Sequence, residues 1–339
     1  MDITPLLSNL AELHAHVGSS IAPHVLWHIA NAEGYKLPKR DYHEFSNYVV
    51  LTQKRKMTLK EYLDEIYHPI LDKLSSGTRA LEKAVYETFS GAYRGGITLY
   101  ELRGNPMKHN KEGEVDLDHA ILAMLHGMER SLLEYPKLRA GIIFCLDRQF
   151  NLKQNTVIVE KAIKYAHRGV IGIDFSNYNK NGFHYKDYAA LVKKARNHGL
   201  HVTAHTGETV DTNDMWECIE SIAPERIGHG IKAAYDTDLM KEIAKRNIVL
   251  EVCPLSNLVT KAVKNIDEMK HIFSQFERYG VQFTINTDWP ETIEGGHLDE
   301  QFIFLYEHGL LNKEQIKKAI QTAFQATFVP NERKTNLYL

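Results

Sequence analysis

The sequence has few cysteines and no long apolar run. Its 339 residues include three cysteines, Cys145, Cys218 and Cys253, which lie far apart and form no Cys-x-x-Cys pair. This usage argues against a disulfide framework and a cysteine-ligated metal site, and it favours the reducing cytoplasm. No apolar stretch reaches the roughly 20 residues that a membrane-spanning helix needs. The N-terminal segment MDITPLLSNLAELHAH lacks the basic and long apolar regions of a signal peptide.

The sequence also lacks a strong excess of charge of either sign. It has 41 basic and 43 acidic residues, which give a formal net charge of −2. We therefore expect no nucleic-acid partner and no membrane-surface partner. The hydrophobic share of 43% and the charged share of 25% are typical of a globular protein. Because no segment rich in Pro, Gly or Ser marks a linker, we expect residues 1–339 to form a single domain.

Eight short apolar runs, rich in Val, Ile, Thr and Phe, recur along the chain, and amphipathic helical segments separate most of them. The runs lie near residues 10–16, 96–105, 139–149, 169–176, 199–208, 226–230, 247–256 and 280–290. Strands that alternate with helices indicate parallel βαβ units, and eight such units predict an α/β fold of the TIM (β/α)8 barrel type. The first strand-to-helix turn, HVGSSIAP, lacks the Gly-x-Gly-x-x-Gly pattern of a doubly wound dinucleotide-binding fold.

Two further segments are predicted to add helices to the barrel. The stretch between the first two runs, about residues 20–90, is too long for one crossover and predicts several inserted helices. An insertion at the catalytic end of a barrel often forms a lid. The segment 311–334 predicts closing helices at the C-terminus.

Residues suited to metal binding and acid–base chemistry end four of the apolar runs. They are His14, His16, His205, Glu208, His229 and Asp288. Each alone has an ordinary explanation, such as a core histidine or a capping aspartate. In a parallel barrel, however, the C-terminal strand ends meet at one mouth, so the whole set is expected to converge. Imidazoles and a carboxylate suit Zn²⁺, which lowers the pKa of bound water towards neutrality. The set therefore predicts a metal-assisted hydrolase.

Five segments, in this order and at these spacings, resemble the adenosine deaminase family of metal-dependent aminohydrolases in the amidohydrolase superfamily. They are ELHAHVGSS, TAHTGE, RIGHG, LEVCPLSN and TINTDWP. The resemblance extends from about residue 10 to the segment TFVPNERK near the C-terminus. It implies a TIM barrel with extra helices after the first strand, which agrees with the pattern of runs.

The resemblance also implies a role for each site residue. The matched ligands of one Zn²⁺ per chain are His14, His16, His205 and Asp288. Glu208 matches the acid that protonates purine N1, and His229 matches the residue that positions and deprotonates the attacking water. Asp288 would also accept a hydrogen bond from that water. The expected reaction replaces the 6-amino group of a purine by a 6-oxo group and releases ammonia.

The candidates for substrate contact are Trp289, Gly207, Asn177 and Tyr62. Trp289 stands where the family usually has a second aspartate that hydrogen-bonds purine N7, and an indole N–H can only donate. We expect Trp289 either to stack on the base or to pack beneath the lid. Tyr62 belongs to the expected apolar lid. Asn177 lies where the family's backbone usually meets purine N3, although the usual Gly-Asp-Glu triplet is absent there.

The exact substrate stays open at this point. Gly18 and Ser19 replace a usual Asp-Gly pair, so the acid that would face a ribose 5′-hydroxyl is missing. Besides adenosine, the alternatives are adenine, N6-methyl-AMP and aminodeoxyfutalosine. Either Arg103 or Arg148 could bind an anionic substrate group, or it could tie barrel loops to acidic neighbours.

Two further alternatives lie outside deamination of a 6-aminopurine. One is another amidohydrolase-type C–N hydrolase. It is less favoured because the run near 169–176 lacks the lysine that often bridges two metals in such enzymes. The other is a deaminase-like binding protein without activity, and the complete set of candidate residues argues against it.

Overall fold

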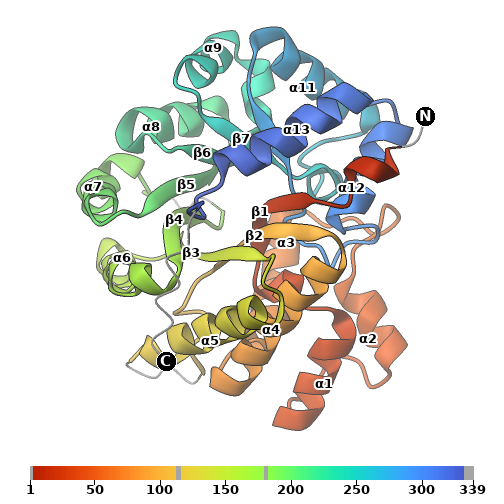
Figure 1. Cartoon of the computed structure of the whole chain (residues 1–339), viewed down its shortest axis with the longest axis vertical. Helices are drawn as coiled ribbons and strands as arrows, with labels where there is room; N and C mark the ends of the chain where they lie inside the picture. Colours follow the sequence, from red (N-terminus) through yellow and green to blue (C-terminus); the bar gives the residue numbers. More distant parts are fainter. Residues whose placement is uncertain (1–2, 112–115, 179–181, 332–339) are drawn as a thin grey trace.

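The computed structural model describes residues 3–111, 116–178 and 182–331. Eight parallel strands form one sheet in the order of the sequence, with helices around them (Figure 1), which confirms the predicted TIM-barrel fold class. The strands are β1 Leu10–His16, β2 Ile97–Gly104, β3 Arg139–Asp147, β4 Val170–Ser176, β5 His201–Thr206, β6 Arg226–His229, β7 Val249–Val252 and β8 Phe283–Ile285.

The barrel closes between β8 and β1 through the segment that follows β8. The backbone N–H of Asp288 donates to the His14 carbonyl at 2.8 Å, and the His16 N–H donates to the Asp288 carbonyl at 3.2 Å. The buried carboxylate of Glu12 spans the same seam, since it accepts from the His14 N–H at 2.8 Å and the Thr287 N–H at 3.0 Å. The barrel is therefore closed by residues that also belong to the candidate site.

Strand β1 carries an irregularity that alternation along the sequence does not reveal. Glu12 pairs with Tyr100 and Ala15 pairs with Leu102, so β1 uses one more residue than β2 between these pairs. Such a bulge bends a strand and changes the direction of its side chains. His14 lies within this bulge and is fully buried.

Helices follow most of the strands and surround the barrel. In Figure 1, α6 to α9 lie along one side and α11 lies beyond them. The α-helices between β2 and β8 are α5 Asp118–Glu134, α6 Leu152–Tyr165, α7 Ala189–Asn197, α8 Thr212–Ile222, α9 Thr237–Lys245, α10 Pro254–Val259 and α11 Ile266–Tyr279. Short 3₁₀ turns are η1 Thr4–Leu6, η2 Gly18–Ser20, η5 Ala166–Arg168, η6 Tyr185–Tyr188 and η7 Ile231–Tyr235.

Local sequence signals explain several helix ends. The Asn151 side chain accepts from the Gln154 N–H and Gln154 reaches back, which is a capping box at the start of α6. Asn265 caps α11 through the Glu268 N–H, and Gly280 ends this helix with a φ of 69°. Glycine is favoured there because the left-handed region costs it little.

The expected helical insertion after β1 is present. It consists of α1 Pro23–Glu33, α2 Tyr42–Val49, α3 Leu59–Tyr62, the π-helical segment η3 Leu63–Asp72 and α4 Thr78–Arg94. Helices α1 and α2 stand at the lower right of Figure 1, away from the ring of helices that follows the strands. The π-helical segment contains Pro69, which has no N–H to donate along a helix.

The predicted closing helices are also present. They are α12 Leu298–Glu307 and α13 Lys313–Ala326. Helix α13 ends at Ala326, earlier than the predicted 334, and residues 332–334 lie outside the described residues. After the helix, the Thr327 hydroxyl and the Phe328 N–H each donate to the Glu101 carboxylate at 2.6 Å. Because Glu101 is a buried residue of β2, these bonds fix the segment that follows α13 to that strand.

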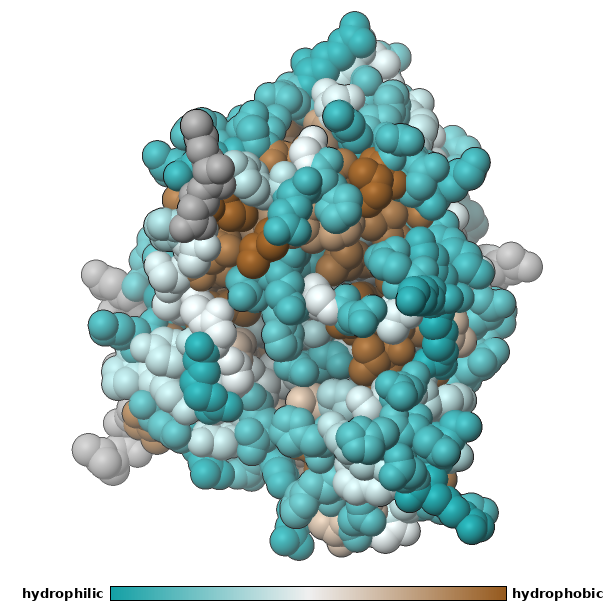
Figure 2. Space-filling view, turned by 90° about the vertical axis from the view of Figure 1, so that its right-hand side faces the viewer, coloured by the Kyte–Doolittle hydropathy of each residue, from teal (hydrophilic) through white to brown (hydrophobic). Residues whose placement is uncertain are grey.

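The outer surface is mostly polar on the face that Figure 2 shows, which is the right-hand side of Figure 1. Hydrophobic side chains appear there mainly in hollows between hydrophilic ones. In the described ranges, no helix has the combination of length and apolar character that crossing a membrane requires.

A glycine on α5 sets how closely α4 and α5 approach. A Cβ at Gly127 would lie 2.6 Å from the Glu82 carbonyl oxygen and 3.0 Å from the Tyr86 nitrogen, both on the α4 backbone. We expect Gly127→Ala to destabilise the fold by roughly 1–3 kcal/mol, because the helices must separate. The measurement is the midpoint of thermal or urea denaturation.

The matched control is Gly91→Ala on α4, where an added Cβ meets nothing within 4 Å. Alanine should stabilise that helix by up to about 1 kcal/mol. A Gly127→Ala protein as stable as the Gly91→Ala protein would contradict the close approach.

Candidate metal and active site

A cavity at the C-terminal ends of the strands collects the predicted site residues. The members of the predicted set that line it are His16, His205, Glu208, His229, Asp288, Asn177 and Trp289. His14 is fully buried and lies directly against the rings of His16, His205 and His229. The barrel therefore brings together residues from the first to the last strand, as the sequence predicted.

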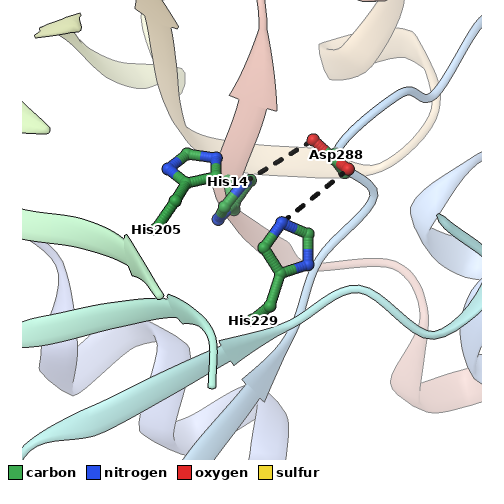
Figure 3. Close-up of side chains that lie close together, drawn as sticks. All are labelled: His14, His205, His229 and Asp288. Atoms are coloured by element: carbon green, nitrogen blue, oxygen red, sulfur yellow. Dashed lines mark ion pairs between the residues drawn. The ribbon is translucent and has the colours of Figure 1, made fainter. Parts of the chain in front are cut away.

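Candidate ligand atoms gather around one point (Figure 3). His14, His205, His229 and Asp288 each offer an atom, and these atoms lie within 4.8 Å of one another. His16 joins them, because its Nε2 is 3.1 Å from His205 Nε2 and 3.3 Å from Asp288 Oδ1. The structure thus brings the four predicted ligands together and places His229 beside them as a further imidazole.

Buried carboxylates orient two of the imidazoles. His14 Nδ1 is 2.7 Å from Glu251 Oε2, and His205 Nδ1 is 2.9 Å from Asp174 Oδ2. A carboxylate partner keeps the proton on Nδ1 and leaves the Nε2 lone pair available to a metal. His14 Nε2 is buried and has no hydrogen-bond partner among the described residues, although it lies 3.6 Å from Asp288 Oδ1. This buried acceptor without a donor fits a metal ion.

The electrostatic surroundings keep the imidazoles of His14, His16 and His229 neutral. Burial is the main cause that lowers the pKa of His14, His16 and His229 well below the usual value for histidine, and positive neighbours lower it further. Among those neighbours is the buried guanidinium of Arg103. Neutral imidazole is the form that binds metals, so the donor set matches a divalent cation such as Zn²⁺.

His229 lies between the two carboxyl groups of the cavity. Its Nε2 is 3.7 Å from Glu208 Oε2 and 4.0 Å from Asp288 Oδ2, while its Nδ1 is 3.0 Å from the amide nitrogen of Asn257. His229 and Asp288 have φ values of 60° and 62°, in the left-handed region that non-glycine residues seldom adopt. Such strain is concentrated at functional sites, where the surrounding structure imposes it.

The two carboxyl groups differ in their surroundings. Asp288 Oδ2 accepts a hydrogen bond of 2.6 Å from the Ser256 hydroxyl, and burial raises the pKa of Asp288 to about 6. Glu208 has one oxygen without a hydrogen-bond partner in the described structure. Burial, followed by the nearby Asp288 charge, raises the pKa of Glu208 to about 8. Glu208 therefore holds a proton at neutral pH, as a general acid must.

Trp289 both lines the cavity and packs within the protein. It is only 2% exposed, and its ring stacks on the Tyr62 ring with centroids 4.0 Å apart. Tyr62 is fully buried, and its hydroxyl lies 2.8 Å from Thr292 Oγ1. Tyr62 thus packs against Trp289, and Trp289 in turn lines the cavity.

The two remaining candidates for substrate contact shape loops at the cavity. The Asn177 amide donates to both oxygens of Asp147 at 3.1 Å. Gly207 has a φ of 68°, and a Cβ there would lie 2.3 Å from the Met215 sulfur. The turn that places Glu208 after β5 therefore requires glycine at position 207.

The two arginines that the sequence offered for an anionic substrate are buried. Arg103 is fully buried and donates to Asp174 at 3.0 Å and Glu251 at 2.9 Å, so it supports the site from beneath. Arg148 lines the cavity but is 3% exposed, and it donates to the Tyr185 hydroxyl and the His205 carbonyl. The contacts of both arginines therefore favour a role in holding the barrel together over a role in binding an anionic substrate group.

Sequence reasoning did not single out Glu251. It is a fully buried residue of β7 that holds His14, Arg103 and, through its other oxygen, the Thr203 hydroxyl at 3.0 Å. The available signal was an acidic residue inside the apolar run NIVLEVCP. Lone carboxylates are seldom buried without partners, so this position indicated a polar network.

Comparison with known proteins agrees with the geometry. A family model described as adenosine deaminase matches residues 9–338. An adenosine deaminase of Clostridium kluyveri is 29% identical over 327 residues, covering 96% of this chain and 91% of that protein. One of Xenopus laevis is 27% identical over 342 residues, covering 96% of this chain and 93% of that protein.

Solved structures share the fold at lower sequence identity. The adenine deaminase of Arthrobacter aurescens superposes with a TM-score of 0.83 at 22% identity, covering 95% of this chain and 94% of the other. The Arabidopsis N6-mAMP deaminase has a TM-score of 0.80 at 22% identity, with 96% and 95% covered.

Removing the charge behind one imidazole should weaken metal binding. We expect Asp174→Asn to lower the affinity for Zn²⁺ by roughly 10- to 100-fold, because the carboxylate that orients His205 becomes neutral. The measurement is competition with a chromogenic chelator. Asp118→Asn is the control, since Asp118 pairs with Lys161 and Lys164 away from the cavity. Unchanged affinity in a folded Asp174→Asn protein would contradict this role.

Proposed function

This chain belongs to the adenosine deaminase family, and we propose that it is a zinc-dependent aminohydrolase that converts a 6-aminopurine, adenosine or a close relative, to the 6-oxo product. The observation that carries the proposal is the meeting of four imidazoles with the carboxyl groups of Asp288 and Glu208 at one cavity. Relatives named adenosine deaminase match nearly the whole chain, which supports the same reaction.

His14, His16, His205 and Asp288 would hold one Zn²⁺ per chain. Their proximity supports this assignment, as do the carboxylates behind His14 and His205. A bound metal of this kind polarises water so that the water can attack a carbon at neutral pH. The network behind the imidazoles keeps them aimed at one point, which limits reorganisation during turnover.

Glu208 and His229 move the protons. Glu208 gives its proton to ring nitrogen N1, which makes C6 a better target for attack. The water oxygen then bonds to C6, while His229 Nε2 accepts a water proton and returns it to the departing amino group. The C6–N bond breaks and ammonia leaves, while the C6 hydroxyl loses its proton and Glu208 regains one. Water therefore supplies the new oxygen, and both groups return to their starting states. Asp288, 4.0 Å from His229 Nε2, would accept a hydrogen bond from the attacking water.

Within the same reaction class, the alternative substrates are adenine, N6-methyl-AMP and aminodeoxyfutalosine. A further alternative is that the enzyme hydrolyses another C–N bond, as other amidohydrolases do. Trp289 and Asn177 both line the cavity at positions where the resemblance implies other residues. The proposed partner is a small purine. The three cysteines are free and buried, which favours the cytoplasm for this enzyme.

The deciding experiment is ammonia release from a panel of 6-aminopurines by protein loaded with stoichiometric Zn²⁺. The panel holds adenosine, 2′-deoxyadenosine, adenine, AMP, N6-methyl-AMP and aminodeoxyfutalosine. We expect release from at least one member, together with appearance of the 6-oxo product. Absence of release from every member by folded, metal-loaded protein would contradict the proposal.

Replacing the proton donor should separate chemistry from metal binding. We expect Glu208→Gln to lower kcat by roughly 10²- to 10⁴-fold, because an amide cannot donate a proton as an acid. Zinc content, measured by metal analysis, should not change, since Glu208 is not a proposed ligand. Glu217→Gln on α8 is the control, because Glu217 pairs with His184 outside the cavity. Turnover at the wild-type rate in Glu208→Gln would show that another group is the acid.

A further inference from the structure

A second cavity adjoins the candidate active site. The two cavities share six lining residues, which are His68, Asp72, Lys108, Asp147, Asn177 and Tyr178. We call the second cavity the outer chamber. Beyond the shared residues it is lined mainly by Lys73, Lys111 and the rings of Tyr35 and Phe150. A ligand held by the catalytic residues can therefore extend past Lys108 into a space with aromatic walls and further lysines.

The shared residues form a connected polar chain. His68 Nδ1 is 2.7 Å from Asp72 Oδ2, and Lys108 Nζ is 3.4 Å from His68 Nε2. Lys108 also forms an ion pair with Asp147, which accepts from the Asn177 amide as well. These two contacts fit the tautomer of His68 that carries its proton on Nδ1, towards Asp72, and accepts from Lys108 at Nε2.

Within this set of connected polar side chains, the ammonium group is more exposed than the carboxylates. The Asp72 and Asp147 side chains are 7% and 2% exposed, and both have partners, whereas Lys108 is 23% exposed. An ammonium group has three N–H donors, and His68 and Asp147 take two of them. Lys108 can thus direct one donor towards a ligand at the boundary between the cavities.

Two more ammonium groups face the same aromatic ring. Lys73 Nζ and Lys111 Nζ lie 5.6 Å and 5.4 Å from the centroid of Tyr35. Glu33 is the acid beside them, 3.3 Å from Lys111 Nζ. Bringing like charges together costs free energy unless an anion offsets it. The outer chamber therefore offers three ammonium groups, of which Lys108 and Lys111 are each paired with an acid and Lys73 lies against the Tyr35 ring.

We infer that the outer chamber binds an anionic group, a phosphate or a carboxylate, of a purine substrate whose base lies at the catalytic residues. The inference rests on the proposed function and narrows its substrate to a 6-aminopurine nucleoside with a negatively charged substituent. Ammonium groups bind both anions through charge-assisted hydrogen bonds. The lysines thereby provide what the buried Arg103 and Arg148 do not.

The test compares charged and uncharged substrates on the zinc-loaded enzyme. We expect AMP, N6-methyl-AMP or adenosine-5′-carboxylate to have a kcat/KM at least tenfold above that of adenosine. Lys108→Met should lower kcat/KM roughly tenfold or more for the anionic substrate, since a hydrogen bond to a charged group is lost. It should change the value for adenosine less than threefold. The phosphate and carboxylate compounds distinguish the two anions.

Lys161→Met is the matched control. Lys161 has the same 23% exposure as Lys108 and also pairs with an aspartate, but it lies outside both cavities. If Lys108→Met fails to fold, the double variant Lys73→Met/Lys111→Met provides the same comparison with two lysines that are more exposed. Calorimetric binding of inosine and IMP to the wild type and the variants gives a second readout that does not need turnover.

The outcomes separate the inference from the proposed function. Ammonia release from adenosine that equals or exceeds release from every anionic analogue, with Lys108→Met affecting all substrates alike, overturns the inference and leaves the deaminase proposal intact. Absence of release from every 6-aminopurine overturns the deaminase proposal instead. In that case, tighter binding of IMP than inosine that Lys108→Met abolishes still supports the outer chamber as an anion site, and equal binding of the two overturns it.

Discussion

One buried guanidinium holds together the groups on which the site depends. Arg103 donates to Asp174 and Glu251, and these carboxylates in turn hold His205 and His14. The planar fork of arginine suits two carboxylates at once, which a lysine would not match. Five strands are therefore linked through this network around one side chain, and the imidazole rings have little freedom to turn. Removing the guanidinium, or one of its two carboxylate partners, would leave a buried charge uncompensated, which costs several kcal/mol.

Much of the fold could be predicted because burial leaves a periodic trace in the sequence. The first run was placed at residues 10–16, and β1 is Leu10–His16. The seventh run extended too far, to 256, because Pro254 begins α10 directly after the strand. The eighth run reached 290, yet β8 ends at Ile285. Apolar character marks buried chain, but it does not tell where a strand stops and a buried loop begins.

The candidate site was predictable to a similar extent, because barrel topology turns separate strand ends into one cluster. What alternation could not supply was the cross-strand register, so the bulge around His14 and the partner role of Glu251 went unseen. Alternation also could not predict that Tyr62 stacks on Trp289, because that contact joins the helical insertion to the segment after β8. Lys108 follows β2 in a segment without periodicity, and its position at the boundary of two cavities depends on helices folded over it.

A metal ion at the candidate site would also join the two edges of the sheet, at the seam between β1 and the segment after β8. The sheet joins its two edges there through the backbone of Asp288, and the same residue offers a ligand together with histidines of β1. A cation bound by both edges is a removable cross-link between the start and the end of the fold, in a chain whose cysteines form no disulfide. During synthesis Asp288 can join the histidines of β1 only after the eighth strand has left the ribosome, so the complete ligand set forms late.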